Sequence, residues 1–105
     1  AVVGFLREWW APMLENPARL QSSEYQTYAV LTMCRALHTL ETGTIVSKPV
    51  AAHWAQARLG EPWATVIAKA LIWRNGAPFD HFEQVTALIR HTVAQGEYLE
   101  QSCAT

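Results

Sequence analysis

The sequence lacks any run of charge of one sign. Its 105 residues carry eight lysines and arginines against nine aspartates and glutamates, for a formal net charge of -1. Proteins that bind nucleic acid through its phosphates carry clustered basic residues, so this even scatter argues against a nucleic-acid partner. Only 16% of the residues are charged and 50% are hydrophobic, which is typical of a packed globular domain rather than a disordered chain.

Long hydrophobic runs are also missing. No apolar stretch approaches the roughly 18–20 residues that a membrane-spanning helix needs. The apolar residues 1–5 are too few for a signal peptide, and Arg7 and Glu8 follow them at once. We therefore expect no membrane partner and a cytoplasmic location.

Cysteine is scarce, and no metal motif is present. We expect Cys34, which lies in a helical pattern, to be a buried free thiol, and Cys103 to be exposed in the C-terminal tail. No two histidines are four residues apart, as they are in a helical metal site. Nucleophile motifs and glycine-rich phosphate loops are absent as well. The sequence therefore predicts no catalytic residue and no metal ligand.

Strand patterns are nearly absent, whereas helical periodicity is strong. Valine and isoleucine recur at helical spacings without sustained alternation. Turn residues divide the chain into about five expected helices, at residues 2–15, 22/23–41, 47–58, 61–74 and 79/80–99. Short connections favour antiparallel neighbours, so we predict a single all-α domain over residues 1–105, an up-and-down bundle of about five helices.

The second expected helix is apolar on nearly all sides, so it should lie in the centre of the bundle. Ser23 followed by Gln26 matches a capping box at its start. Gly43 is a natural terminator because glycine readily adopts the left-handed conformation. Arg35, within this apolar helix, is expected to be a paired or snorkelling arginine that holds neighbouring helices together.

Two further helices give specific expectations. In the first, Trp9 and Trp10 cannot both point inward, so one of them should be partly exposed or docked on a partner, and Pro12 predicts a kink or an end. In the third, the expected inner face consists of Val50, Ala51, Trp54, Ala57 and Arg58.

The start of the third expected helix offers the one local chemistry in the sequence. Ser47 is a good N-cap, and Pro49 is tolerated in a first turn because its missing N–H would have no partner there. The unpaired N–H groups of that turn, with the ammonium of Lys48 beside them, could bind an anion such as phosphate. The alternative is a capped helix with a solvated lysine, and local physics alone favours that alternative.

Residues 28–57 resemble a known family. They are similar to the C-terminal helical domain of the streptomycin/spectinomycin 3″-adenylyltransferases, and the resemblance extends more loosely over about three quarters of the chain. The matching residues are Leu31, Thr32, Arg35, Thr42, Gly43, Ile45, Val46, Ser47, Lys48, Ala51, Ala52, Trp54 and Ala55.

The resemblance implies a role in antibiotic resistance. In that family an N-terminal nucleotidyltransferase domain carries the metal-binding carboxylates and the base, and it transfers AMP from ATP to a hydroxyl of the aminoglycoside. The helical domain closes the cleft. By this resemblance Lys48, with Ser47 beside it, binds the nucleotide phosphates, and Glu24, Trp73 and Arg74 are candidate drug or nucleotide contacts. ATP and Mg²⁺ are implied for the full enzyme.

One departure from the family limits the expectation. The G-S-x₉-D-x-D signature of the nucleotidyltransferase domain is absent from these residues. The resemblance therefore implies an accessory domain that completes the cleft and does not catalyse transfer alone, with the N-terminal domain, ATP and an aminoglycoside as partners. The alternative is a free-standing helical binding or interaction protein that kept only the scaffold, and such a protein could form a homodimer.

Overall fold

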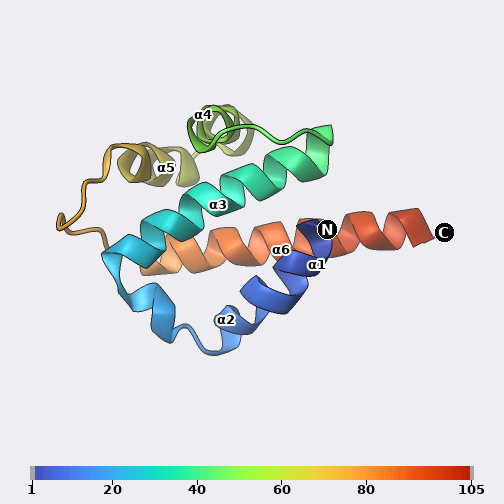
Figure 1. Ribbon diagram of the computed structural model, residues 1–105, viewed down its shortest axis with the longest axis horizontal. Coiled ribbons are helices and arrows are strands. Elements are labelled where there is room, and N and C mark those ends of the chain that lie inside the picture. The colour runs from blue at the N-terminus through green and yellow to red at the C-terminus, as the bar shows by residue number, and fades with distance from the viewer. Residues whose placement is uncertain (1, 105) are drawn as a thin grey trace.

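A computed structural model describes residues 2–104, with the side chains of residues 103 and 104 outside the description, so the exposure predicted for Cys103 lies outside the described residues. The fold is a compact all-α bundle without strands over these residues, which confirms the predicted fold class (Figure 1). The elements are α1 (Val2–Phe5), η1 (Leu6–Trp10), α2 (Ala11–Glu15), η2 (Ala18–Gln21), α3 (Ser23–Thr42), α4 (Lys48–Leu59), α5 (Trp63–Ile72) and α6 (Phe82–Ala104).

The first three elements form one continuous helical segment with a wide turn in its middle. That turn, the π-helical η1, ends two residues before Pro12, which cannot donate the backbone hydrogen bond that a regular helix needs. The predicted end of the helix at Pro12 is wrong, because the segment continues to Glu15; what the structure has instead is a π-helical turn just before the proline. Trp10 is 0% exposed and Trp9 is 44% exposed, as expected for adjacent rings on one helix.

Helix α3 lies in the middle of the bundle, as its all-round apolar character predicts (Figure 1). The predicted capping box does not form. Ser22 is the N-cap, and its Oγ accepts a hydrogen bond from Tyr25 N at 3.1 Å. Ser23 Oγ instead accepts from Phe79 N at 2.9 Å, a contact with the distant α5–α6 connection. The helix ends at Gly43, whose φ of 77° is the left-handed conformation predicted for it.

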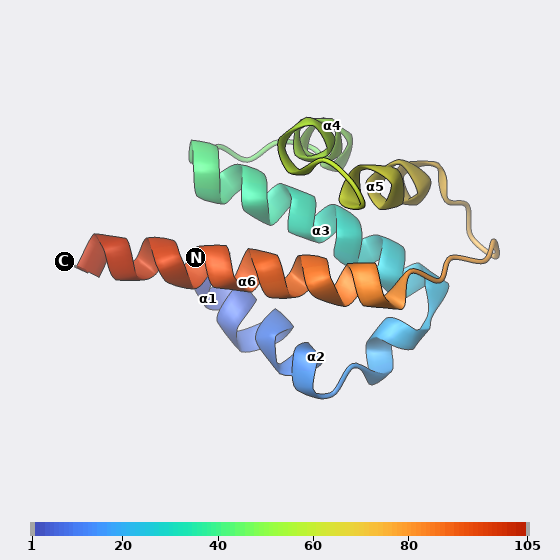
Figure 2. The same ribbon diagram turned by 180° about the vertical axis from the view of Figure 1, so that it is seen from behind.

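Helix α6 lies alongside α3, and its C-terminal end extends beyond the other helices in both views (Figures 1 and 2). The two helices begin close together, because His81 N donates to Gln26 Oε1 at 2.9 Å. At the other end α6 meets the first helical segment, where Arg7 forms an ion pair with Glu100. None of the described helices is both long and apolar enough to cross a bilayer.

The buried face of helix α4 matches the predicted inner face only in part. Ala51, Ala52 and Ala55 are buried, whereas Val50, Ala57 and Arg58 are exposed. Alanine side chains are short, so α4 can pack closely against α3. The predicted inner face is therefore confirmed at Ala51 and in part at the half-buried Trp54, and it is wrong at Val50, Ala57 and Arg58. Close contact between helices favours small residues at the interface, which a search for large apolar positions does not detect.

Two helix boundaries differ from those predicted from the sequence, and one predicted buried thiol is confirmed. Helix α5 ends at Ile72 rather than at residue 74, because Trp73 is extended, with φ -61° and ψ 137°. Helix α6 begins at Phe82 and continues past residue 99. Cys34 is fully buried as predicted, and burial raises the pKa of its thiol to about 12, so the thiol stays protonated and inert at neutral pH.

Candidate functional site

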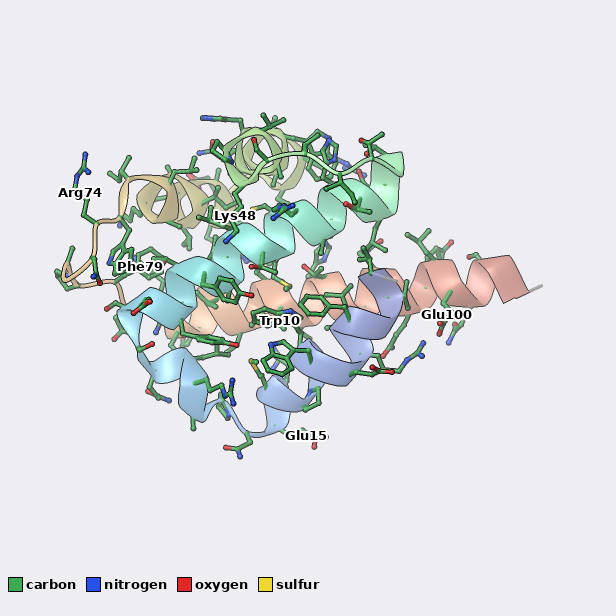
Figure 3. All side chains as sticks on the ribbon, in the orientation of Figure 1. Trp10, Glu15, Lys48, Arg74, Phe79 and Glu100 are labelled. Atoms are coloured by element: carbon green, nitrogen blue, oxygen red, sulfur yellow. The ribbon has the colours of Figure 1, made fainter. Side chains whose placement is uncertain are left out.

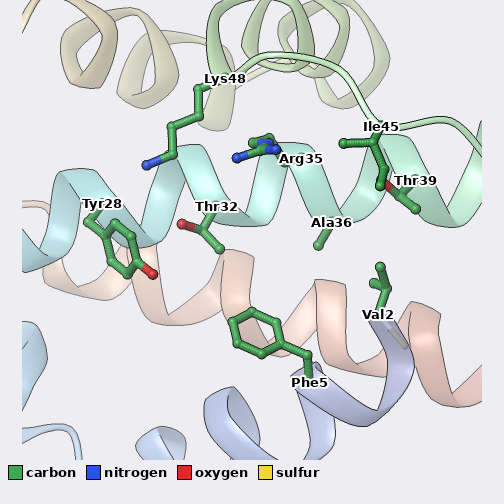
Figure 4. Close-up of a pocket in the computed structure, with 9 residues that line it drawn as sticks. All are labelled: Val2, Phe5, Tyr28, Thr32, Arg35, Ala36, Thr39, Ile45 and Lys48. Carbon is green, nitrogen blue, oxygen red and sulfur yellow. The ribbon is translucent and has the colours of Figure 1, made fainter.

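A groove of about 320 Å³ lies between the first helical segment, α3 and the α3–α4 connection (Figure 4). We call it the Lys48 groove. Its apolar lining comes mainly from the chain start and the connection, and its polar lining from α3 and from the start of α4. The lining residues are Val2, Phe5, Tyr28, Thr32, Arg35, Ala36, Thr39, Ile45 and Lys48.

Lys48 is the first residue of α4, and its side chain reaches from there toward α3 (Figure 4). Its Nζ lies 4.8 Å from the centroid of the Tyr28 ring, within the range of a cation–π contact. Ser47 is the N-cap, as predicted, and its Oγ accepts a hydrogen bond from Val50 N at 3.4 Å. The lysine therefore faces the groove, while the serine hydroxyl is engaged in capping the helix.

Arg35 is the second cation of the groove. Its Nε donates to the carbonyl oxygen of Val46 at 3.1 Å, which ties α3 to the α3–α4 connection rather than to a neighbouring helix. Among the described side chains, carboxylates form ion pairs only between Arg7 and Glu100 and between Arg58 and Glu41. Lys48 and Arg35 thus share one groove with no carboxylate partner, an arrangement that favours an anionic ligand.

The structure keeps the other candidate residues apart from this groove. Trp73 and Arg74 line a separate hollow of about 530 Å³ beside the α5–α6 connection, and Arg74 lies at the edge of the molecule, away from Lys48 (Figure 3). The indole N–H of Trp73 donates to Ala77 O at 2.8 Å. Glu24 is exposed in the first turn of α3, one turn before Tyr28, or about 6 Å along the helix axis.

Two residues that line the groove, Tyr28 and Arg35, are not among the site residues predicted from the sequence. Tyr28 is 40% exposed at the edge of the groove. Arg35 is predicted only as a link between neighbouring helices. The sequence signal that could have identified them is their helical spacing with Thr32 and Thr39. This spacing places all four residues on the face of α3 that lines the groove, next to Lys48.

No cluster of three or more metal-ligating side chains occurs in the part of the chain that the structure describes. The fold and the groove together define the class of protein. It is an all-α domain with a groove at the start of α4, where Arg35 and Lys48 have no carboxylate partner among the described side chains.

The family model for the C-terminal domain of aminoglycoside adenylyltransferases matches residues 8–97. The chain belongs to this family, which confirms the resemblance seen in residues 28–57. No curated protein and no solved structure gives a significant match.

Proposed function

We propose that this domain forms one wall of the ATP and aminoglycoside cleft of an adenylyltransferase, with Lys48 and Arg35 directed at the triphosphate of ATP. The opposite wall would be an N-terminal nucleotidyltransferase domain that brings the Mg²⁺ ligands and the base. The observation that carries the proposal is the Lys48 groove itself, because two cations from two different helices line it and no carboxylate does.

The groove suits a polyphosphate better than it suits a polycationic drug or a bare metal ion. Arg35 presents a planar fork of donors, and Lys48 presents a compact charge, which together match several phosphate oxygens. At the start of α4 the N–H of Val50 is capped by Ser47 and Pro49 has no N–H, so the helix contributes the positive end of its dipole rather than a set of free donors. ATP, when bound, supplies the AMP group, and the two cations hold and orient its phosphates.

An aminoglycoside carries several ammonium groups and would be repelled by Lys48 and Arg35. Glu24 is the nearer candidate for it, because this exposed carboxylate lies one helical turn from the edge of the groove. Trp73 and Arg74 remain candidate contacts at the separate hollow, where Asp80 is also part of the lining.

Replacing Lys48 with methionine is expected to weaken binding of tripolyphosphate by about tenfold, the effect of losing a charged hydrogen bond. Isothermal titration calorimetry of the 105-residue chain with tripolyphosphate and with ATP measures it. Arg90→Met is the matched control, since it also removes one exposed positive charge and Arg90 lines neither the Lys48 groove nor the second hollow. Equal loss in both variants, or no binding by the unmodified chain at millimolar ligand, would contradict the proposal.

We also expect the 105-residue chain to transfer no AMP by itself. Its sequence contains a single aspartate, Asp80, and so cannot supply a D-x-D pair of metal ligands. Incubation of the purified chain with ATP, Mg²⁺ and either streptomycin or spectinomycin, followed by mass spectrometry of the drug, tests this. An adenylylated drug would show that these residues are a catalyst rather than one wall of the cleft.

A further inference from the structure

The contact between Lys48 and Tyr28 points to a role for the tyrosine. We propose that Tyr28 is a positioning residue that holds the ammonium of Lys48 in the groove before the phosphates arrive. This inference rests on the proposed function of the groove. It assigns to Tyr28 no contact with the reacting atoms, only an effect on where the lysine charge lies.

The geometry fits this role. The Nζ atom of Lys48 lies 4.8 Å from the ring centroid of Tyr28, and the face of an aromatic ring attracts a cation at that range. Figure 4 shows the two side chains at the same end of the groove, Lys48 coming from the start of α4 and Tyr28 from α3. The contact therefore fixes the start of α4 to α3 at the groove, in addition to the packing between the two helices.

The Tyr28 ring packs against two other aromatic rings, which hold it in place. The fully buried Trp10 lies with its ring centroid 6.0 Å from that of Tyr28, at an interplanar angle of 33°. Tyr25, one turn earlier on the same side of α3, packs edge-on at 5.5 Å and 63°. Tyr28 thus offers Lys48 a fixed partner, although the tyrosine is 40% exposed.

An uncharged partner serves an anion site better than a carboxylate would. A lysine side chain has many rotamers, and Arg35 in the same groove repels its charge. A carboxylate would hold Lys48 but would cancel the charge that attracts phosphate. The Tyr28 ring holds the ammonium without cancelling it, just as the Val46 carbonyl holds Arg35.

The first test reads the contact directly in the ligand-free chain. The ε-methylene protons of Lys48 should be shifted upfield by the Tyr28 ring in proton–carbon correlation spectra, and the exposed Lys69 provides an internal reference because the chain has no other lysine. Tyr28→Phe should keep the shift, and Tyr28→Leu should remove it. Lys48 signals that coincide with those of Lys69 in the unmodified chain would overturn the inference without any variant.

The second test reads the consequence for binding. Tyr28→Leu is expected to weaken tripolyphosphate binding by about two- to fivefold, the range of an exposed cation–π contact, whereas Tyr28→Phe should bind as the unmodified chain does. In a Lys48→Met background Tyr28→Leu should have no further effect, because the ring then has no ammonium to hold. An equal loss in both backgrounds would assign Tyr28 a merely structural role and overturn the inference alone.

The two tests also separate this inference from the function on which it rests. An upfield shift of Lys48 in a chain that binds neither tripolyphosphate nor ATP would overturn the proposed function and, with it, the role of Tyr28 in phosphate binding. Normal phosphate binding with no shift would leave the proposed function standing and remove Tyr28 from it.

Discussion

Replacing Trp10 with alanine is expected to lower the free energy of unfolding by about 3–5 kcal/mol, the usual cost of removing a large ring from a core. Trp10 is 0% exposed and packs against three other rings. The centroid distances are 6.3 Å to Phe5, 6.1 Å to Tyr25 and 6.0 Å to Tyr28. Its loss would open a cavity between the first helical segment and α3. Urea unfolding followed by far-UV circular dichroism measures the change.

Two further variants make this expectation specific. Trp9→Ala, the same substitution one residue earlier, should cost less than about 1 kcal/mol, because Trp9 is 44% exposed and its ring lies 5.4 Å from the guanidinium carbon of Arg19 at the surface. Trp10→Phe should cost clearly less than Trp10→Ala, because the buried Nε1 of Trp10 has no hydrogen-bond partner among the described residues. Similar losses for Trp9→Ala and Trp10→Ala would show that Trp10 is not a core residue.

Much of the fold follows from rules that act within a few residues of sequence. Ser47 and Gly43 occupy the cap positions predicted for them, because capping depends on side-chain chemistry and on glycine's conformational freedom. The unequal burial of Trp9 and Trp10 follows from helical geometry alone. The central place of α3 follows from its apolar surface on nearly all sides.

The parts that could not be predicted depend on contacts between distant segments. Ser23 fits the sequence pattern of a capping box, yet its hydroxyl accepts a hydrogen bond from the backbone N–H of Phe79, 56 residues away. The separation of Arg74 from Lys48 depends on the path of the α5–α6 connection, which no local pattern specifies (Figure 3). The place of Tyr28 at the groove depends on where the start of α4 lies over α3. Hydrogen bonds from a side chain to the backbone of a distant segment leave no periodic pattern in the sequence, although such contacts determine where the site residues lie.

Gln26 is the clearest such residue, and Gln26→Leu is expected to lower the free energy of unfolding by about 2–4 kcal/mol. This side chain is 1% exposed inside the bundle. Its Nε2 donates to Leu20 O at 2.8 Å, and its Oε1 accepts from His81 N at 2.9 Å. Leucine has a similar volume but leaves both backbone groups without their partner, so the cost comes from lost hydrogen bonds rather than from a cavity.

Gln21→Leu is the matched control, since Gln21 ends η2 and is exposed, and it should change stability by less than about 0.5 kcal/mol. Urea unfolding gives both values, and hydrogen exchange at the amide of His81 should accelerate in Gln26→Leu alone. Equal stabilities of the two variants would show that Gln26 does not join α3 to the α5–α6 connection. Because that connection carries Trp73 and Arg74, a confirmed loss would also identify what holds the second hollow in place.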